Sequence, residues 1–152
     1  MIRLIISDCD GVLTDGKLYY GAEGEVLKVF NVKDGTAIKA LMSEGVKFGV
    51  VSGRGSAALL RRAEELGLDF CHMNISDKAE AVAALREQYG VAVHETLFVG
   101  DDTNDCVVRS ECGHLYAVND AAQALLEICD VQLKTKGGAG VFKEVLKRIH
   151  GN

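Results

Sequence analysis

Aspartates are crowded at the point where the first apolar run of the chain ends. The stretch SDCDGVLTDG, residues 7–16, contains Asp8, Asp10 and Asp15 and directly follows IRLII. Crowded carboxylates repel one another, and a divalent cation relieves that repulsion. Mg²⁺ takes oxygen ligands, commonly one or two carboxylates together with water and substrate phosphate. This stretch therefore predicts a site for magnesium and phosphate.

Short apolar runs alternate with amphipathic helical patterns along the rest of the chain. The predicted strands cover 2–7, 46–52, 95–100 and 114–118, with weaker candidates at 68–73 and 130–134. The predicted helices cover 34–44, 55–66, 77–89 and 140–149, and Ser76 is the expected N-cap of the third. Strands that alternate with helices indicate βαβ units. We expect an α/β fold, a Rossmann-like three-layer sandwich with a mostly parallel sheet.

One segment interrupts the alternation. Residues 17–32, KLYYGAEGEVLKVFNV, indicate two strands around a turn at Gly21–Gly24, which predicts a β-hairpin inserted after the first strand. The length of 152 residues suits one domain, so we expect residues 1–152 to form a single unit.

The predicted sheet would bring distant polar groups to one edge. In open α/β sheets, ligands bind beyond the carboxyl ends of the strands. The polar groups that follow a strand or begin a helix are Asp8, Asp10, Ser52, Gly53, Arg54, Lys78, Asp101, Asp102 and Asp105. We expect Asp8, Asp10 and Asp101 to form the Mg²⁺ site. The Ser52 hydroxyl and the Lys78 ammonium suit phosphate oxygens.

Composition excludes several other classes of protein. The net charge is −5, with 17 Lys and Arg against 22 Asp and Glu, which argues against nucleic acid as a partner. No apolar run approaches the roughly 20 residues of a membrane span. Five cysteines without a C-x-x-C pair indicate reduced thiols, and the N-terminal apolar run is too short for a signal peptide. We expect a cytoplasmic protein.

Four motifs in order carry a family resemblance. DCDGVLTDG, VVSGR, Lys78 and GDDTND resemble the four motifs of the haloacid-dehalogenase-like (HAD) phosphatases. Within that family the chain is similar to small members without a cap domain, the 3-deoxy-D-manno-octulosonate 8-phosphate (KDO 8-phosphate) phosphatases. The hairpin, FNVKDGTAIK (30–39) and GGAGVFKEV (137–145) carry this narrower match. The resemblance implies a homotetramer whose hairpins pack together and whose neighbouring subunits close the active site.

The resemblance also implies a mechanism. Asp8 would attack phosphorus to give an aspartyl-phosphate, and Asp10 would protonate the leaving oxygen and later deprotonate water. Mg²⁺ would be held by Asp8, the backbone carbonyl of Asp10, and Asp101. A sugar-acid phosphate would be the substrate.

Other residues receive supporting roles from the same resemblance. Ser52, Lys78 and the backbone N–H of Gly11 would hold the transferring oxygens. Asp105 would support the metal indirectly or orient Lys78. The residues expected to contact substrate are Gly11, Gly53, Arg54, Lys33 and Asp34.

Alternatives remain open at this point. Nonulosonate 9-phosphate phosphatases share the scaffold but tend to carry an acidic residue where this chain has Arg54. Met73–Asn74 and Val141–Lys143 depart from the pattern of KDO 8-phosphate phosphatases, and these departures leave the sugar acid open. A response-regulator receiver would also cluster aspartates, but it fits the inserted hairpin poorly. A non-catalytic oligomerisation domain is the third alternative.

Several single residues also have plain structural readings. Alone, Lys78 would be a surface lysine. Asp102 suits a helix N-cap, and Asp15 is either structural or faces substrate. Cys9 is expected to face the core. The glycines at 137, 138 and 140 lead into the last predicted helix, which indicates that this segment is docked.

Overall fold

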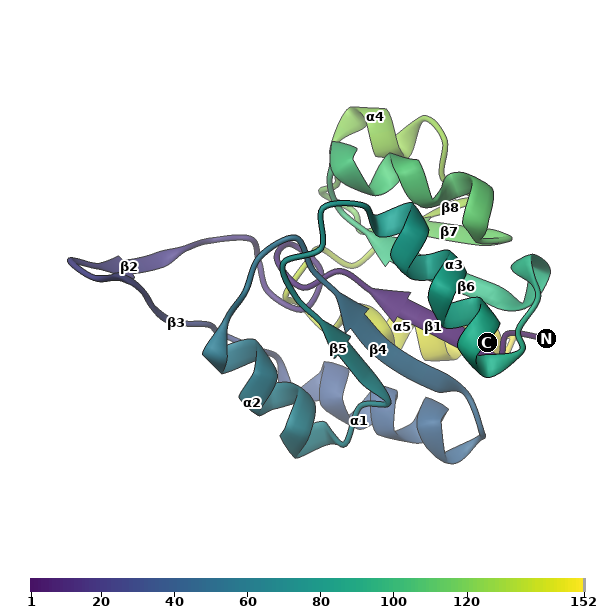
Figure 1. The fold of residues 1–152 in the computed structure, drawn as a ribbon, viewed down its shortest axis with the longest axis horizontal. Helices are drawn as coiled ribbons and strands as arrows, with labels where there is room; N and C mark the ends of the chain where they lie inside the picture. The colour runs from purple at the N-terminus through teal and green to yellow at the C-terminus, as the bar shows by residue number, and fades with distance from the viewer. Residues whose placement is uncertain (152) are drawn as a thin grey trace.

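A six-stranded parallel sheet lies at the centre of the molecule, in the order β5-β4-β1-β6-β7-β8 (Figure 1). The strands are β1 (Leu4–Ser7), β4 (Lys47–Val51), β5 (Phe70–His72), β6 (Thr96–Gly100), β7 (His114–Ala117) and β8 (Val131–Gln132). This computed structural model describes residues 1–151. The sheet confirms the predicted α/β fold, because each predicted strand is present and each neighbouring pair is parallel.

Helices cover both faces of the sheet, which makes the three layers (Figure 1). On one face α1 (Val32–Ser43) packs against α5 (Val141–Ile149), with α2 (Ala57–Leu66) beside α1. On the other face α3 (Lys78–Tyr89) packs against η2 (Thr103–Glu111), which is followed by α4 (Gln123–Leu126). Right-handed crossovers place the helices on these two faces. The chain adds β4 and β5 on one side of β1 and then returns to add β6, β7 and β8 on the other side, so the later helices cover the opposite face.

Short helical segments escaped prediction, and one cap was assigned to the wrong residue. η1 (Val93–Glu95) and α4 were not expected, and η2 was indicated only by its N-cap Asp102, because single turns and 3₁₀ segments leave little apolar periodicity. The N-cap of α3 is Asp77, whose side chain accepts a hydrogen bond from the Glu80 N–H at 3.1 Å. The prediction of Ser76 was therefore wrong by one residue.

The core is continuous on both faces of the sheet. All four residues of β1 and all five of β6 are buried, as expected for parallel strands covered by helices on both sides. Phe48 of β4 meets Phe142 of α5 edge to face, with ring centroids 5.0 Å apart. This rigid centre fixes where the carboxyl ends of the strands lie.

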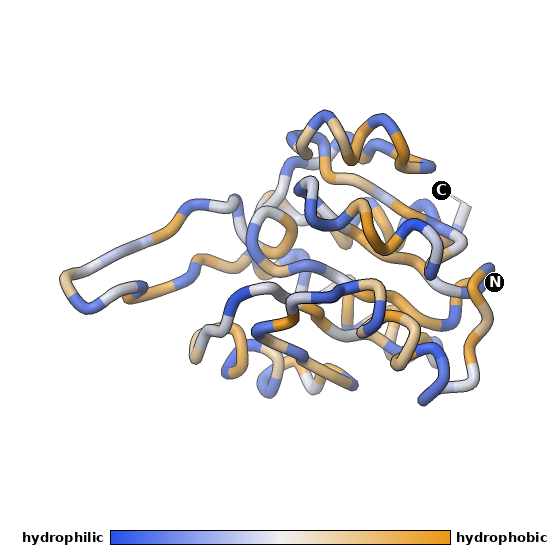
Figure 2. Tube along the Cα trace, turned by 45° about the horizontal axis from the view of Figure 1, so that its top comes forward, coloured by the Kyte–Doolittle hydropathy of each residue, from blue (hydrophilic) through white to orange (hydrophobic). Residues whose placement is uncertain are grey.

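The hairpin stands away from the rest of the molecule (Figure 1). β2 (Tyr19–Gly21) and β3 (Gly24–Leu27) pair antiparallel around the predicted turn, and Gly24 has φ +109°. Figure 2 shows hydrophobic stretches along this projecting segment. Its exposed apolar residues are Leu18, Tyr19, Tyr20, Val26, Leu27 and Val29. Among the described residues, no helix is long and apolar enough to cross a membrane.

Candidate active site

The loop after β1 presents Asp8 at the carboxyl edge of the sheet. The backbone N–H of Asp8 donates to the Val99 carbonyl at 3.0 Å, and its Oδ1 accepts from the Cys9 N–H at 2.7 Å. Gly11 has φ +85°, and a Cβ there would fall 1.8 Å from Asp101 Oδ2. Only glycine therefore lets the loop and Asp101 approach this closely.

Thr14 holds the loop together from inside. Its Oγ1 accepts hydrogen bonds from the backbone N–H groups of Gly11 at 3.3 Å and Gly16 at 3.2 Å. The structure therefore engages the Gly11 N–H, which was expected to contact phosphate, within the loop itself. A bound phosphate would compete with Thr14 for this donor.

Three carboxylates meet at this edge. Asp8, Asp101 and Asp105 each offer an oxygen, and these oxygens lie within 4.8 Å of one another. Asp105 is fully buried and accepts from the N–H groups of Asp101 at 2.9 Å and Asp102 at 3.2 Å. Lys78 is 3 % exposed, with Nζ 2.6 Å from Asp105 Oδ1 and 3.3 Å from Asp8 Oδ2. The buried lysine thus links two of the three carboxylates.

Burial makes this cluster costly without a cation. Desolvation raises the pKa of Asp8 above its ordinary value, and the neighbouring Asp105 adds to that rise. Desolvation also raises the pKa of Asp101, which is further raised by a hydrogen bond with Asp8. Burial alone would lower the pKa of Lys78, but Asp8 and Asp105 outweigh it and raise that pKa.

These donors fit a hard divalent cation. Three carboxylates, two buried and one half-buried, face one ammonium, so negative charges outnumber the nearby positive charge. Burial first, and the neighbouring carboxyl groups second, raise the pKa values of Asp8 and Asp101. Asp105 already accepts three hydrogen bonds, so Asp8 and Asp101 have the freer oxygens. Carboxylate oxygens in this number suit Mg²⁺.

Asp10 points to a different partner from Asp8. Its Oδ1 lies 2.7 Å from Lys28 Nζ, and Lys28 also lies 3.0 Å from Glu25 Oε2. The Lys28 side chain is only 4 % exposed, although it comes from the base of the projecting hairpin. Arg54 approaches the same carboxylate at 3.9 Å. The Asp10 side chain is absent from the described three-carboxylate cluster, which contains Asp105 instead.

A cavity of about 220 Å³ opens above these groups. It lies at the carboxyl ends of β1, β4 and β6, where ligands bind in open α/β sheets. Its lining residues are Asp8, Asp10, Gly16, Ser52, Gly53, Arg54, Lys78, Asp101, Asp102 and Asn104. Ser52 is nearly buried, and its Oγ accepts from the Arg54 N–H at 3.2 Å. Most of the residues predicted for the site are thus brought together in one cavity.

Lys33 and Asp34 lie elsewhere in this single chain. Asp34 is 3 % exposed, and its Oδ1 accepts from the backbone N–H of Phe142 at 2.9 Å. It thereby joins the start of α1 to the start of α5. Lys33 lines a separate hollow beside α5. The two residues are adjacent in the chain but face different surroundings.

The C-terminal glycines support the loop after β1. The Gly138 N–H donates to the Val12 carbonyl at 3.0 Å, and a Cβ on Gly137 would fall 1.9 Å from the Gly11 carbonyl oxygen. Asn31, the N-cap of α1, donates from its side chain to the Gly138 carbonyl at 3.1 Å. This segment is therefore docked against the first aspartate loop of the same chain.

Sequence reasoning missed the hairpin's part in the site. Glu25 and Lys28 carry opposite charges on a predicted strand. Their spacing in the sequence does not indicate that Lys28 contacts Asp10. One signal was available: the hairpin directly follows the aspartate loop in the chain. Asp102, whose role was open, is the N-cap of η2 and accepts from the Thr103 N–H at 2.7 Å.

Comparison with known proteins gives the same family twice. Two models described as haloacid dehalogenase-like hydrolase match residues 18–108 and 73–145. The chain is 41 % identical over 148 residues to the 3-deoxy-D-manno-octulosonate 8-phosphate phosphatase of Haemophilus influenzae, covering 97 % of this chain and 82 % of that one. It is 36 % identical over 144 residues to the Escherichia coli K12 enzyme of the same name, covering 95 % of this chain and 77 % of that one.

Solved structures agree with the sequence comparisons. The cobalt-bound H. influenzae deoxy-D-mannose-octulosonate 8-phosphate phosphatase superposes with a TM-score of 0.95 at 40 % identity, over 99 % of this chain and 88 % of that one. The Moraxella catarrhalis phosphatase, in complex with magnesium, phosphate and KDO, gives 0.94 at 32 % identity, over 99 % and 82 %. The chain belongs to the haloacid dehalogenase-like hydrolases.

Proposed function

We propose that this protein is a Mg²⁺-dependent phosphomonoesterase that converts KDO 8-phosphate to KDO and phosphate through an aspartyl-phosphate. The observation that carries the proposal is the position of Asp8. Its carboxylate lies between the Lys78 ammonium and Asp101, and it lines the cavity. The names of the relatives given above supply the substrate.

Asp8 and Asp10 divide the reaction between them. An Asp8 oxygen bonds to phosphorus while the bond from phosphorus to the sugar oxygen breaks, and Asp10 gives that oxygen a proton. Asp10 then takes a proton from a water molecule that attacks phosphorus, which releases phosphate and restores Asp8. Both carboxylates line the cavity, as this division requires.

The metal would be held by the side chains of Asp8 and Asp101 and by the Asp10 backbone carbonyl. When bound, Mg²⁺ supplies positive charge that lowers the repulsion between the phosphate and Asp8. Asp105 keeps Lys78 and the Asp101 backbone in place through the hydrogen bonds described above.

Lys78 and Ser52 are proposed to hold the transferring phosphate oxygens. Lys78 is held rigidly by two carboxylates, so its ammonium is positioned before substrate arrives. Ser52 lies at the end of β4 with its hydroxyl at the cavity. Lys28 orients the Asp10 carboxylate from the hairpin side.

Arg54 is the proposed contact for the sugar-acid carboxylate. Its side chain is 42 % exposed at the rim of the cavity, and its guanidinium suits a planar carboxylate. A nonulosonate 9-phosphate would present the same two anionic groups on a longer sugar, but the relatives named above are KDO 8-phosphate phosphatases and do not favour it.

A substrate panel tests the proposal. Phosphate release should be measured for KDO 8-phosphate, a nonulosonate 9-phosphate and a simple sugar phosphate, each with Mg²⁺ and with EDTA. We expect the highest kcat/KM for KDO 8-phosphate and loss of turnover with EDTA. A higher kcat/KM for the nonulosonate would reassign the substrate, and no release from any ester would reject the enzyme in favour of a non-catalytic domain.

Assembly as a homotetramer through the hairpin is part of the proposal. The hairpin exposes apolar side chains that a monomer would leave in water, among them Tyr20 at 62 % and Val26 at 65 % exposure. Val26→Glu should lower the mass seen by light scattering and reduce kcat/KM, because neighbouring subunits would no longer close the site. Val107→Glu is the matched control, since Val107 is 54 % exposed outside the hairpin. An unchanged mass for Val26→Glu would contradict this assembly.

The proposal also includes one phosphatase domain over residues 1–152 and a cytoplasmic location. The five cysteines are free thiols among the described residues, which suits a reducing compartment.

A further inference from the structure

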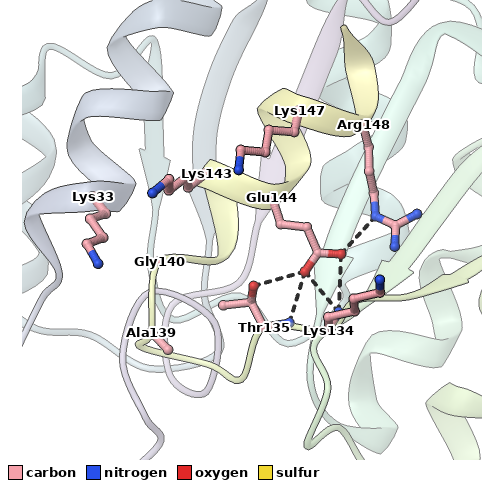
Figure 3. Close-up of a pocket in the computed structure, with 9 residues that line it drawn as sticks. All are labelled: Lys33, Lys134, Thr135, Ala139, Gly140, Lys143, Glu144, Lys147 and Arg148. Carbon is pink, nitrogen blue, oxygen red and sulfur yellow. Dashed lines mark hydrogen bonds and ion pairs between the residues drawn. The ribbon is translucent and has the colours of Figure 1, made fainter. Parts of the chain in front are cut away.

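A second hollow, separate from the catalytic cavity, lies beside α5 (Figure 3). It has a volume of about 620 Å³ and shares no lining residue with that cavity. We call it the basic groove and define it by its five cationic residues, Lys33, Lys134, Lys143, Lys147 and Arg148. Glu144 is the one carboxylate among its described lining residues.

Glu144 is already engaged by the protein. Its Oε1 accepts from the Thr135 N–H and the Thr135 hydroxyl, both at 2.9 Å. It also accepts from the Lys134 backbone N–H at 2.9 Å and from Arg148 Nε at 2.8 Å. Glu144 therefore fixes the loop after β8 to α5 and pairs with Arg148, which leaves the lysines uncompensated.

Four ammonium groups of the groove have no carboxylate within 4.0 Å in residues 1–151. Figure 3 shows Lys143 and Lys147 reaching from α5 toward α1, which carries Lys33. Lys143 and Lys147 are four residues apart on one helix, an arrangement of like charges that destabilises a helix slightly. The chain as a whole carries −5, so this concentration of positive charge opposes its overall balance.

The walls of the groove are fixed by packing. A Cβ on Gly140 would fall 3.3 Å from the Lys33 Cβ, so the stem of Lys33 lies directly against the start of α5. The next residue, Asp34, accepts a hydrogen bond from the Phe142 N–H at 2.9 Å. The charged groups thus project from a rigid concave surface, and such a surface concentrates their electric field.

We propose that the basic groove binds a compact polyanion that carries at least two phosphate groups. Ammonium groups bind phosphate as point charges. One phosphate carries at most about two negative charges at neutral pH, fewer than the four ammonium charges of the groove. No aromatic side chain is among the described lining residues, so the groove offers nothing on which nucleic acid bases could stack. A small ligand with adjacent phosphates, such as pyrophosphate or the tail of a nucleotide, matches this chemistry.

Residue-resolved NMR titration of the protein as purified tests this site. Four anions are titrated separately at constant ionic strength: pyrophosphate, ATP, monophosphate and sulfate. EDTA is present throughout, because removing divalent cations also limits binding at the proposed metal-dependent cavity. We expect saturable shifts of the Lys33, Lys143 and Lys147 amides with pyrophosphate and ATP, at least about tenfold tighter than with monophosphate or sulfate. The Ser52 and Gly53 amides report separately on the catalytic cavity.

A pair of charge-matched variants decides the outcome. Lys143→Gln/Lys147→Gln should weaken pyrophosphate binding at least about tenfold, whereas Lys17→Gln/Lys39→Gln removes two exposed lysines outside the groove and should leave binding unchanged. Equal weakening in both variants, no saturation, or equal affinity for sulfate would overturn the proposal. A double-stranded DNA that displaced pyrophosphate would also overturn it, because the ligand would then be an extended polyanion. None of these results depends on phosphatase activity.

Discussion

The catalytic cavity and the basic groove both carry lysines, but the protein treats them in opposite ways. Lys78 in the cavity is 3 % exposed and lies within 3.3 Å of two carboxylates. Lys143 and Lys147 in the groove are exposed and have no carboxylate partner among residues 1–151. In the cavity, charge is part of the packed structure and is held ready for a reaction. In the groove, charge is left uncompensated, and the fold does not depend on it.

This contrast predicts different costs for removing a lysine. A buried ion pair that loses one partner leaves an uncompensated charge in a poorly solvated place, which is strongly destabilising. An exposed lysine that loses its charge changes little, and relief of repulsion from its neighbour can even stabilise the helix. Measurements of unfolding free energy alone can therefore test whether the lysines of the two regions differ in this way.

The largest effect is expected for Lys78→Met. The free energy of unfolding should fall by about 3–5 kcal/mol and turnover should be lost, because Asp8 and Asp105 would face each other without the ammonium. Lys143→Met is the matched substitution in the groove and should change stability by at most about 0.5 kcal/mol. Urea denaturation and phosphate release measure both.

A second variant separates charge from packing at Lys78. Lys78→Met/Asp105→Asn removes one charge of each sign and should regain part of the lost stability without regaining turnover. If the double variant were no more stable than Lys78→Met, or if Lys143→Met were equally costly, the contrast between the two regions would be wrong.

The next largest effect is expected for Lys28→Met. This change frees the Asp10 carboxylate from its 2.7 Å contact, and kcat should fall by about 10- to 10²-fold while KM changes little. Lys17→Met is the control, since Lys17 is exposed near the hairpin. An unchanged kcat for Lys28→Met would show that Lys28 only supports the hairpin.

Metal binding should release protons. Burial raises the pKa values of Asp8 and Asp101, so we expect one of these carboxyls to hold a proton that Mg²⁺ must displace. Mg²⁺ affinity should therefore rise with pH, and calorimetry in buffers of different ionisation enthalpy should show release of about one proton near neutral pH. Asp101→Asn should abolish the release. Proton uptake, or affinity independent of pH, would contradict the account of the carboxylate cluster.

The smallest effect concerns Asp34, a buried carboxylate beside the groove. Burial raises its pKa from 3.8 to about 6, so the folded protein binds this proton more tightly than the unfolded chain does. Its contribution to stability is therefore fully present below pH 3.8 and is lost as pH rises through about 6. Asp34→Asn should remove this slope, which is at most about 1.4 kcal/mol per pH unit, as measured by urea denaturation at successive pH values with Mg²⁺ present. If unfolding free energy changed equally with pH in the two proteins, a group other than Asp34 would cause the change.

The layout of the fold could be predicted from the sequence, because buried parallel strands form short apolar runs that alternate with amphipathic helices. Boundaries were weaker: Ser76 and Asp77 can both cap a helix, and the geometry of the preceding loop selects Asp77. Single helical turns such as α4 bury too few side chains to produce a hydrophobic periodicity in the sequence.

The site was predictable in its chemistry and less so in its contacts. Residues at strand ends converge because the parallel sheet aligns those ends, which places Asp8, Ser52 and Asp101 at one cavity. The contact between Lys28 and Asp10 depends on how the hairpin folds back, and local sequence does not encode that direction. Lys33 and Asp34 show the same limit, since a helix start turns neighbouring residues to different sides.

The proposed mechanism depends on phosphorylation of Asp8, which a trapping experiment can detect. Excess enzyme with Mg²⁺ is mixed with KDO 8-phosphate, quenched in acid within the first turnover and reduced with borohydride, which marks an acyl-phosphate for peptide mass spectrometry. We predict the mark at Asp8 and nowhere else, and Asp8→Asn should lose both the mark and turnover by about 10³-fold or more, with its folding intact. Full single turnover without a mark at position 8, or substantial activity in Asp8→Asn, would contradict the account.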